Sequence, residues 1–422
     1  MKEVENVTKE GTMERILNPN SIDSAWERVR SNGGSGGVDG RNIDETFEHL
    51  RKHWRGIEES LRAGRYVPSP VLGIKIPKGS GGERLLGIPT VQDRIIQQAL
   101  HQMLTESFDH LFSNHSYGFR PKRSAHNAVK TAQDFVLSGK NWVVDIDISS
   151  FFDCVNHDIL MGQLMAVEDD RRVLGLIRKY LKTGMVIDGK LIKRKVGTPQ
   201  GGPLSPLLAN VYLDRLDKEL ESRGLSFCRY ADDVNIYVSS ERSATRVLES
   251  IVAWIEKHLK LTVNASKSGV GRPWERQFLG FTIRESGDLD LSPRSEKRYK
   301  ERIRSLWNAE QNLTTKGLIE QWQNYIRGWW NYFRLTETAW RIRQLEGWTR
   351  RHIRKCFWLR WHNWKGRLNK LRRLGAKTYH QSIAWSSRGA WRIANSPALK
   401  TVLKNSLLRN YGLTFPSDFS AK

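Results

Sequence analysis

Two adjacent carboxylates lie in the segment FCRYADDVNIYV, residues 227–238, which otherwise consists largely of strand-forming residues. Asp232 and Asp233 repel each other and resist burial, so they need either solvent or a positive partner. A solvated tip between two strands would satisfy them, since Asp is common in turns. A divalent cation held at a rigid turn would also satisfy them, and it would require further carboxylates.

The strand-like segment NWVVDIDISSFFD, residues 141–153, supplies such carboxylates. Asp145 and Asp147 are two residues apart, so they lie on one face of a strand. The alternative is that one of them pairs with an arginine or caps the following helix. Together with Asp232 and Asp233 they resemble a site that holds two cations about 3.5–4 Å apart for nucleotidyl transfer. There, one cation activates the attacking 3′-oxygen and the other stabilises the leaving pyrophosphate.

The segments around these acids have either helical or strand-like hydrophobic patterns. Helical patterns occupy residues 12–32, 43–64, 91–108, 169–184, 198–224 and 244–261. Strand patterns occupy 66–89, 141–152, 227–238 and 278–292, and three of these read as hairpins. From about residue 293 onward the pattern is helical and basic.

The positive charge is concentrated in the last third of the chain. The net charge is +24, and residues 291–422 alone hold 28 Lys and Arg against 7 Asp and Glu, together with 11 of the 16 tryptophans. Cations release counterions from phosphates, and aromatic rings stack on unpaired bases, so this segment predicts nucleic-acid binding. For any single basic run the alternative is a solvated helix face.

Other features limit the class of protein. No apolar run approaches 18 residues, and the start MKEVENVTKEGTMERIL lacks the apolar core of a signal peptide. We therefore expect no membrane segment and a cytoplasmic location. The three cysteines, Cys154, Cys228 and Cys356, lie far apart, which argues for a reducing compartment and against a cysteine zinc site.

Ordered blocks of the chain resemble those of bacterial group II intron-encoded reverse transcriptases and maturases, in detail the compact group IIC type. The blocks are SAWERVRSNGGSGGVDG (24–40), RLLGIPTVQDRIIQQAL (84–100), SYGFRPKRSAHNAV (116–129), DISSFFD (147–153), GTPQGGPLSPLLANVYL (197–213), YADD (230–233), FLGF (278–281) and IRGWWNYFR (326–334). The chain departs from the family pattern at Leu85, where proline is common, and at Ser149-Ser150, where Lys-Gly is common. Neither change removes a reacting group.

The resemblance implies an α+β fold of the right-hand polymerase type, with fingers and an antiparallel palm sheet followed by a helical thumb. The expected boundaries are an N-terminal extension at 1–65, fingers and palm at 66–290, the thumb or maturase domain at 291–365, and a basic nucleic-acid-binding region at 366–422. Because the chain has no cysteine pairs and little length beyond Phe419, we expect no zinc-dependent endonuclease domain.

The resemblance also assigns roles to residues. Asp147, rather than Asp145, acts with Asp232 and Asp233 as the catalytic ligands of two Mg²⁺ ions, with Mn²⁺ as a possible substitute. Phe152 is the steric gate beneath the sugar, with a plain core residue as the alternative. The remaining nucleotide-binding residues are Lys78, Arg84, Arg120, Gln200 and Lys267, of which Lys267 matches the lysine that protonates pyrophosphate. The alternatives are a surface ion pair for each finger arginine and a solvated side chain for Lys267. The primer grip comprises Phe278, Leu279, Gly280 and Phe281. His126 and His157 are interpreted as structural.

The predicted function is RNA-directed DNA synthesis for a mobile group II intron, with assisted splicing and retrohoming by target-primed reverse transcription. The expected partners are the intron RNA, an RNA template with a DNA primer, target DNA and dNTPs, with no membrane. Four arginines of the basic tail, Arg372, Arg373, Arg388 and Arg392, are the predicted RNA contacts. A splicing-only maturase and a reverse transcriptase of another retroelement or defence system are the alternatives; the intact carboxylates argue against the first, and the thumb block and basic tail against the second.

Overall fold

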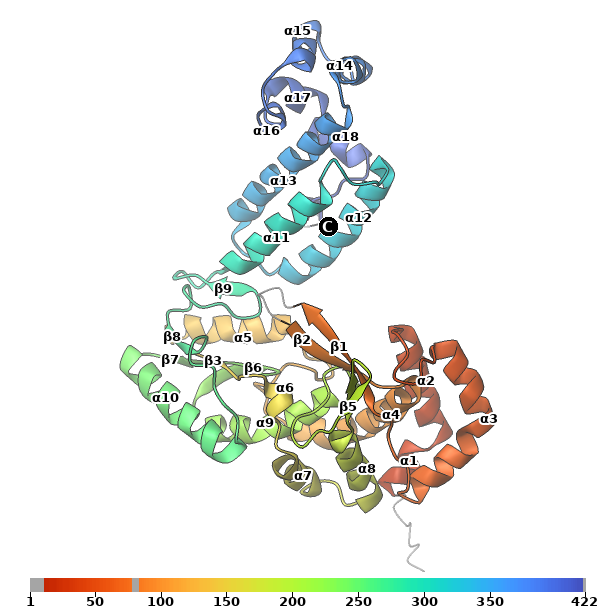
Figure 1. Ribbon diagram of the computed structural model, residues 1–422. Helices are drawn as coiled ribbons and strands as arrows, with labels where there is room; N and C mark the ends of the chain where they lie inside the picture. Colours follow the sequence, from red (N-terminus) through yellow and green to blue (C-terminus); the bar gives the residue numbers. More distant parts are fainter. Residues whose placement is uncertain (1–10, 78–82, 420–422) are drawn as a thin grey trace, which may run out of the picture. The chain divides into compact units, whose positions relative to one another are not determined.

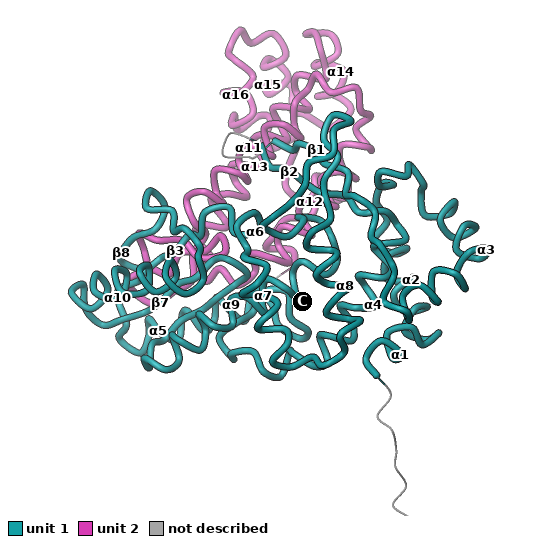
Figure 2. Tube along the Cα trace, turned by 60° about the horizontal axis from the view of Figure 1, so that its bottom comes forward, with its two compact units in different colours: residues 1–272 teal, residues 273–422 magenta. Residues whose placement is uncertain are grey.

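The computed structural model describes residues 11–77 and 83–419. The chain forms two compact units, which divide between Arg272 and Pro273 (Figure 2). The first unit contains the predicted catalytic acids, and the second contains the basic region. Each unit is described separately below.

Four helices lie together on one side of the first unit (Figure 1): α1 (Thr12–Ile16), α2 (Pro19–Asn32), α3 (Ile43–Arg62) and α4 (Val91–Phe108). Pro19 occupies the first turn of α2 while Asn18 caps its N-terminus, which separates α2 from α1 within the range predicted to be helical. Buried Asp93 on α4 accepts hydrogen bonds from Tyr66 Oη at 2.8 Å and Tyr180 Oη at 3.0 Å. These bonds fix the segment before the first strand against α4 and α8 (Arg171–Lys182).

The first of two four-stranded sheets has the order β2-β1-β4-β5. Strands β1 (Val71–Pro77) and β2 (Glu83–Ile88) form the predicted hairpin, and β1 pairs in parallel with β4 (Met185–Ile187). Strand β5 (Lys190–Ile192) returns antiparallel to β4 through Asp188-Gly189, both with positive φ. This short second hairpin was not predicted from the sequence.

The second sheet, the palm sheet, is antiparallel and has the order β6-β7-β3-β8. Its strands are β6 (Ser226–Tyr230), β7 (Asp233–Val238), β3 (Trp142–Asp147) and β8 (Gly269–Gly271). On one face, Val144 and Ile236 join a large apolar core together with α9 (Ser205–Ser222) and α10 (Glu241–Trp254). On the other face, Tyr237 packs against Phe135 of α5 (Ala125–Leu137), so helices cover both sides (Figure 1).

Four shorter elements complete the first unit as the structure describes it, of which the 3-10 turn η1 (Asp109–Leu111) directly follows α4. Helix α6 (Phe151–Cys154) follows β3 and precedes α7 (His157–Met165). The turn η2 (Ile255–Leu259) extends α10 as a π-helical segment, within the range that the sequence predicts as one helix.

The second unit begins with the two-stranded hairpin β9 (Phe281–Ile283) and β10 (Leu289–Leu291). Three long helices follow: α11 (Pro293–Leu306), α12 (Thr315–Phe333) and α13 (Ala339–Arg360). Their core includes Trp307, Trp322 and Trp358, so part of the tryptophan enrichment serves packing rather than RNA contact. The remaining elements are α14 (Trp364–Arg373), α15 (Thr378–Gln381), η3 (Ser382–Trp385), α16 (Ala390–Ile393), α17 (Pro397–Val402), α18 (Asn405–Asn410) and α19 (Pro416–Phe419).

The predicted α+β class with an antiparallel palm sheet is confirmed. Within residues 11–77 and 83–419, the helices are too short or too polar to cross a bilayer.

Candidate active site

The predicted catalytic acids lie together at one end of the palm sheet. Asp147 ends β3 and is the cross-strand partner of Asp233, which begins β7. Asp232 occupies the two-residue connection between β6 and β7, after Ala231 with φ of +58°. Directly opposed residues of antiparallel strands project on the same face, so Asp147 and Asp233 share one face of the sheet. Asp232 adjoins Asp233 in the turn and lies within electrostatic reach of Asp147.

Burial and mutual repulsion govern the charge of these acids. Burial raises the pKa of Asp233 to about 7, and the charges of Asp145, Asp232 and Asp147 add to this effect. Burial likewise raises the pKa of Asp232, with a further contribution from Asp147. In the described part of the chain, no three His, Cys, Asp or Glu side chains are already arranged as a metal site. The donor chemistry still fits a hard divalent cation, because these are oxygen ligands whose repulsion a dication would relieve.

A buried ion pair supports the YADD turn. Arg229, fully buried on β6, donates to the buried Asp217 of α9 at 2.6 and 2.7 Å. Its remaining hydrogen bonds go to Asn210 Oδ1, Ser116 Oγ and the carbonyl of Ala231, all within 3.0 Å. Arg229 therefore connects the turn directly to the core of the first unit.

Gly118 packs against the same turn. A Cβ on Gly118 would lie 2.4 Å from the backbone nitrogen of Ala231, so a larger residue would displace the turn. Asn210 Nδ2 donates to the carbonyl of Gly118 at 2.8 Å, which joins this residue to Arg229. Three blocks that are distant in sequence thus meet behind the catalytic acids.

The two phenylalanines after β3 have different environments. Phe151 is buried in the core, whereas Phe152 is only partly buried and meets Phe151 edge-on at 5.2 Å between ring centroids. The carbonyl of Phe152 accepts a hydrogen bond from Thr198 N at 2.7 Å. A partly exposed ring five residues after Asp147 is compatible with the predicted steric gate, which stays a prediction.

The loop that contains Gln200 is held by β2 and α4. The carbonyl of Gln200 accepts from Gly87 N at 2.7 Å. A Cβ on Gly201 would lie 2.6 Å from the carbonyl oxygen of Gly87, and one on Gly202 would lie 2.4 Å from Gln97 Oε1. The half-buried Gln200 side chain is therefore carried on a tightly packed loop.

The predicted triphosphate contacts differ in their surroundings. Arg84 is exposed on β2, and its charge lowers the pKa of Asp232, so it lies within electrostatic reach of the site. Lys78 lies outside the described residues. Arg120 is buried and donates to Asp109 and to the carbonyls of Ser113 and Ser116. These contacts favour a structural role for Arg120 over the predicted nucleotide contact.

Lys267 lies directly beside a catalytic acid. Its Nζ is 3.3 Å from the carboxylate of Asp147, and its side chain is largely exposed. Ser268 Oγ accepts from Asp147 N at 2.9 Å and so fixes the end of β3. Of the two histidines interpreted as structural, His157 is buried and contacts the carbonyl of Gly197 at 2.7 Å.

The predicted primer grip belongs to the second unit. Phe278 and Phe281 exchange backbone hydrogen bonds across Leu279 and Gly280, which both have positive φ. Tyr332 Oη donates to the carbonyl of Leu279, and Ser295 Oγ donates to that of Gly280, each at 2.9 Å. This tight turn is thus fixed to α12 and α11, and its contact with a primer stays a prediction.

The four predicted RNA contacts, Arg372, Arg373, Arg388 and Arg392, are all exposed in the second unit. Nearby, Trp364 and Trp385 expose 44% and 55% of their surface, with ring centroids 5.8 Å apart. Exposed aromatic rings beside arginines match the composition of surfaces that bind single strands, and RNA contact by these arginines stays a prediction.

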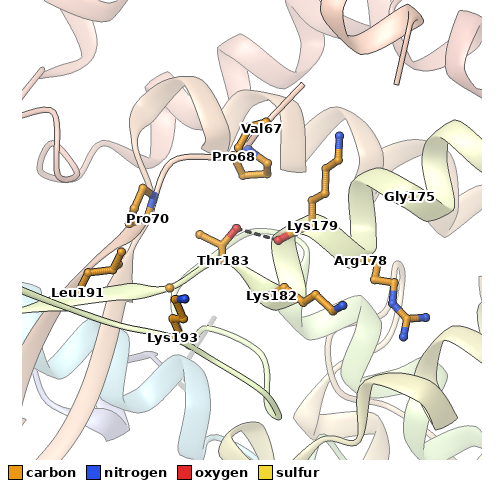
Figure 3. Close-up of a pocket in the computed structure, with 11 residues that line it drawn as sticks. Val67, Pro68, Pro70, Gly175, Arg178, Lys179, Lys182, Thr183, Leu191 and Lys193 are labelled. Atoms are coloured by element: carbon orange, nitrogen blue, oxygen red, sulfur yellow. Dashed lines mark hydrogen bonds between the residues drawn. The ribbon is translucent and has the colours of Figure 1, made fainter. Parts of the chain in front are cut away.

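A recess that the sequence motifs did not indicate lies elsewhere on the first unit (Figure 3). Its volume is about 410 Å³, and its walls come from residues 67–70, α8 and the β4–β5 hairpin. Lys182 and Lys193 line it, whereas Lys179 Nζ is engaged by the carbonyls of Gly64 and Tyr66 at 2.8 Å. Its lining shares no residue with the predicted site.

Comparison with known families matches two parts of the chain. Residues 76–283 match the family "Reverse transcriptase (RNA-dependent DNA polymerase)". Residues 296–375 match "Group II intron, maturase-specific domain". The two matches occur in the order that the sequence blocks predict.

Individual proteins are similar to parts of the chain. The chain is 32% identical to Protein YkfC of Escherichia coli over 56% of its own length and 71% of that protein. It is 37% identical to the group II intron-encoded protein LtrA of Lactococcus lactis over 51% of its own length and 36% of LtrA. Among solved structures, a partial Cas6-RT-Cas1–Cas2 complex is 27% identical with a TM-score of 0.38, over 59% of this chain and 43% of that one.

Proposed function

We propose, since this chain belongs to the group II intron reverse transcriptases and maturases, that it copies RNA into DNA at the acidic end of its palm sheet. The observation that carries the proposal is the cross-strand pairing of Asp147 with Asp233 beside the Asp232 turn. Carboxylates held on adjacent strands form a rigid set of oxygen ligands.

Asp147, Asp232 and Asp233 would hold two Mg²⁺ ions, with Mn²⁺ as a substitute, and these ions would activate the primer 3′-oxygen and stabilise the leaving pyrophosphate. Lys267 lies 3.3 Å from Asp147 and is the proton donor for that leaving group. Phe152 limits the space beneath the sugar. Arg84 and Lys78 hold the triphosphate, since guanidinium and ammonium groups bind phosphate oxygens.

The second unit would recognise nucleic acid. Its maturase-specific segment and exposed arginines bind the group II intron RNA and assist splicing, with counterion release as the main driving force. With target DNA as primer and dNTPs as substrates, the same chain would carry out retrohoming by target-primed reverse transcription.

The test separates polymerisation from splicing. Asp232→Ala should reduce Mg²⁺-dependent extension of a DNA primer on an RNA template to a few per cent of wild type or less. The same variant should still bind the intron RNA and support its splicing, because the second unit is unchanged. Extension by the variant at wild-type rate would contradict the site, and a wild type that splices without extending primers would indicate a splicing-only maturase.

A further inference from the structure

A cleft of about 390 Å³ lies in the second unit between α11, α13 and α16. This volume falls in the range of about 300–1,000 Å³ that is typical of small-molecule sites. Its lining includes Arg304, Trp307, Asn308, Trp348, His352 and Trp391, and it also contains Lys355. The lining contains no carboxylate, so the cleft is apolar and positively charged.

One wall of the cleft is aromatic. The ring centroid of His352 lies 4.1 Å from that of Trp348 and 4.5 Å from that of Trp391, and both tryptophans are partly exposed. Burial lowers the pKa of His352 to about 4, with nearby Lys355, Arg304 and Arg351 acting in the same direction. All three rings are therefore uncharged at neutral pH. They are tilted by 51–64° to one another, His352 is buried, and the Arg351 guanidinium lies 3.9 Å from the ring centroid of Trp391. The partly exposed ring of Trp348 is therefore the one on which an unpaired base can stack.

The rim of the cleft is cationic. The guanidinium of Arg304 lies 5.4 Å from the ring centroid of Trp348, and Lys355 lines the cleft from α13. Neither cation forms an ion pair with a carboxylate within residues 11–77 and 83–419. Both charges thus remain available for a phosphate group.

The cleft also offers a side-chain amide. Asn308 lines it directly after the buried Trp307, and its side chain is exposed. An exposed amide can donate to the carbonyl or ring nitrogen of a base.

We propose that this cleft binds one unpaired nucleotide of an RNA. Its base stacks on the ring of Trp348 and accepts a hydrogen bond from the side-chain amide of Asn308, while its phosphate lies beside Arg304 and Lys355. The inference rests on the proposed function, in which the second unit binds RNA. It adds that this cleft recognises a nucleotide only when its base is unpaired. A purely structural cluster that packs α16 on α13 is the alternative.

The test uses an RNA hairpin with a single bulged 2-aminopurine and the same hairpin fully paired. The wild type should bind the bulged hairpin roughly tenfold more tightly and quench its fluorescence, as expected for one stacked base. The double variant Arg304→Ala/Lys355→Ala should lose most of this preference. The matched control Arg298→Ala/Arg343→Ala removes two exposed charges from the same helices and should keep it.

Two further measurements do not depend on those variants. Asn308→Ala removes the side-chain amide and should weaken bulged binding by about fivefold, the effect of one lost hydrogen bond. In the wild type, a bulged 4-thiouridine should crosslink to peptides that contain Trp307, Trp348 or Trp391. Crosslinks confined to other segments would overturn the proposal.

Equal wild-type affinity for bulged and paired RNA, or an equal loss of preference in both double variants, would also overturn it. A preference shown only with the same hairpins made of DNA would overturn the assignment to RNA. Normal primer extension with no bulge preference would refute this inference alone, whereas a wild type that binds no RNA would refute the proposed function as well.

Discussion

Phe151 and Phe152 are neighbours in sequence but have different surroundings, and a pair of substitutions should separate their roles. Phe152→Ala should open space for a 2′-hydroxyl and raise incorporation of rNTPs relative to dNTPs. Phe151→Ala should leave that ratio unchanged but lower the free energy of unfolding by about 3–5 kcal/mol, the usual cost of emptying a core site. Competitive single-nucleotide incorporation and thermal unfolding measure the two effects. If Phe152→Ala polymerises with an unchanged sugar ratio, the gate lies elsewhere.

Arg229 should be essential for the YADD turn, since it is buried with Asp217 and donates to the Ala231 carbonyl. Arg229→Met leaves an unpaired buried carboxylate and should destabilise the protein by about 3–5 kcal/mol. Adding Asp217→Leu removes that charge and should restore stability, while the lost contact to Ala231 keeps primer extension low. Urea unfolding and extension rates measure both. Full activity in the double variant would contradict a positioning role for Arg229.

The sequence pointed to the three acids that lie at one end of the palm sheet, but not to the residues that support their turn. Asp147, Asp232 and Asp233 lie in recognisable blocks, because two-metal chemistry requires carboxylates at fixed positions. Arg229 joins Ser116 and Asn210, which are 113 and 19 residues away, so only the folded chain reveals this network. Arg120 belongs to an equally clear block, yet its partners Asp109, Ser113 and Ser116 are local and mostly backbone.

The helices and hairpins around the palm follow their hydrophobic patterns, and the differences have local causes. The range 12–32 divides at Asn18-Pro19, since a residue before proline avoids helical geometry and Pro19 suits a first turn. The β4–β5 hairpin has only three residues in each strand and an exposed KLI segment, so strand periodicity is too short to detect. Its Asp-Gly turn was the available signal.

The contact between α13 and α16 should make stability depend on pH through His352. Its pKa is about 4 in the folded protein, so between pH 6.5 and 4 the unfolded chain binds a proton that the folded chain does not. The free energy of unfolding should therefore fall as the pH falls through this window, by up to about 3 kcal/mol. His352→Phe should remove most of this dependence.

The matched control is His362→Asn, which changes an exposed histidine of the same unit at a position with φ of +56°. Tryptophan fluorescence follows unfolding, because 11 of the 16 tryptophans lie in residues 291–422. Identical pH profiles for wild type and His352→Phe would contradict the assignment.

Positive charge is concentrated in the last third of the chain, so we expect RNA recognition to depend on basic residues that polymerisation does not require. Changing Arg372, Arg373, Arg388 and Arg392 to Ala should weaken intron RNA binding and splicing more than extension of a saturating, pre-annealed primer. Each lost phosphate contact should also reduce the slope of log K against log salt by roughly 0.7–0.9. Equal slopes and affinities for both proteins would indicate that these arginines are only a solvated surface.

The family was predictable at this scale, because ordered blocks extend through both matched segments, and the predicted reverse transcriptase with a maturase domain is confirmed. The cleft between α11, α13 and α16 was not predictable, since Trp307, Trp348 and Trp391 read in sequence only as part of a tryptophan-rich region.

If Asp147 and the YADD acids form the site of nucleotidyl transfer, substitution of Asp147 should slow the reaction far more than substitution of its strand neighbour Asp145. Asp145 lies on the same strand and the same face, two residues before Asp147. The measurement is the single-turnover rate of dNTP addition to a DNA primer on an RNA template for Asp147→Asn and Asp145→Asn. We expect this rate to fall by at least about 100-fold for Asp147→Asn and by less than about tenfold for Asp145→Asn, because only Asp147 is proposed to act in the reaction. Similar rates for Asp147→Asn and wild type, or a greater loss for Asp145→Asn, would contradict it.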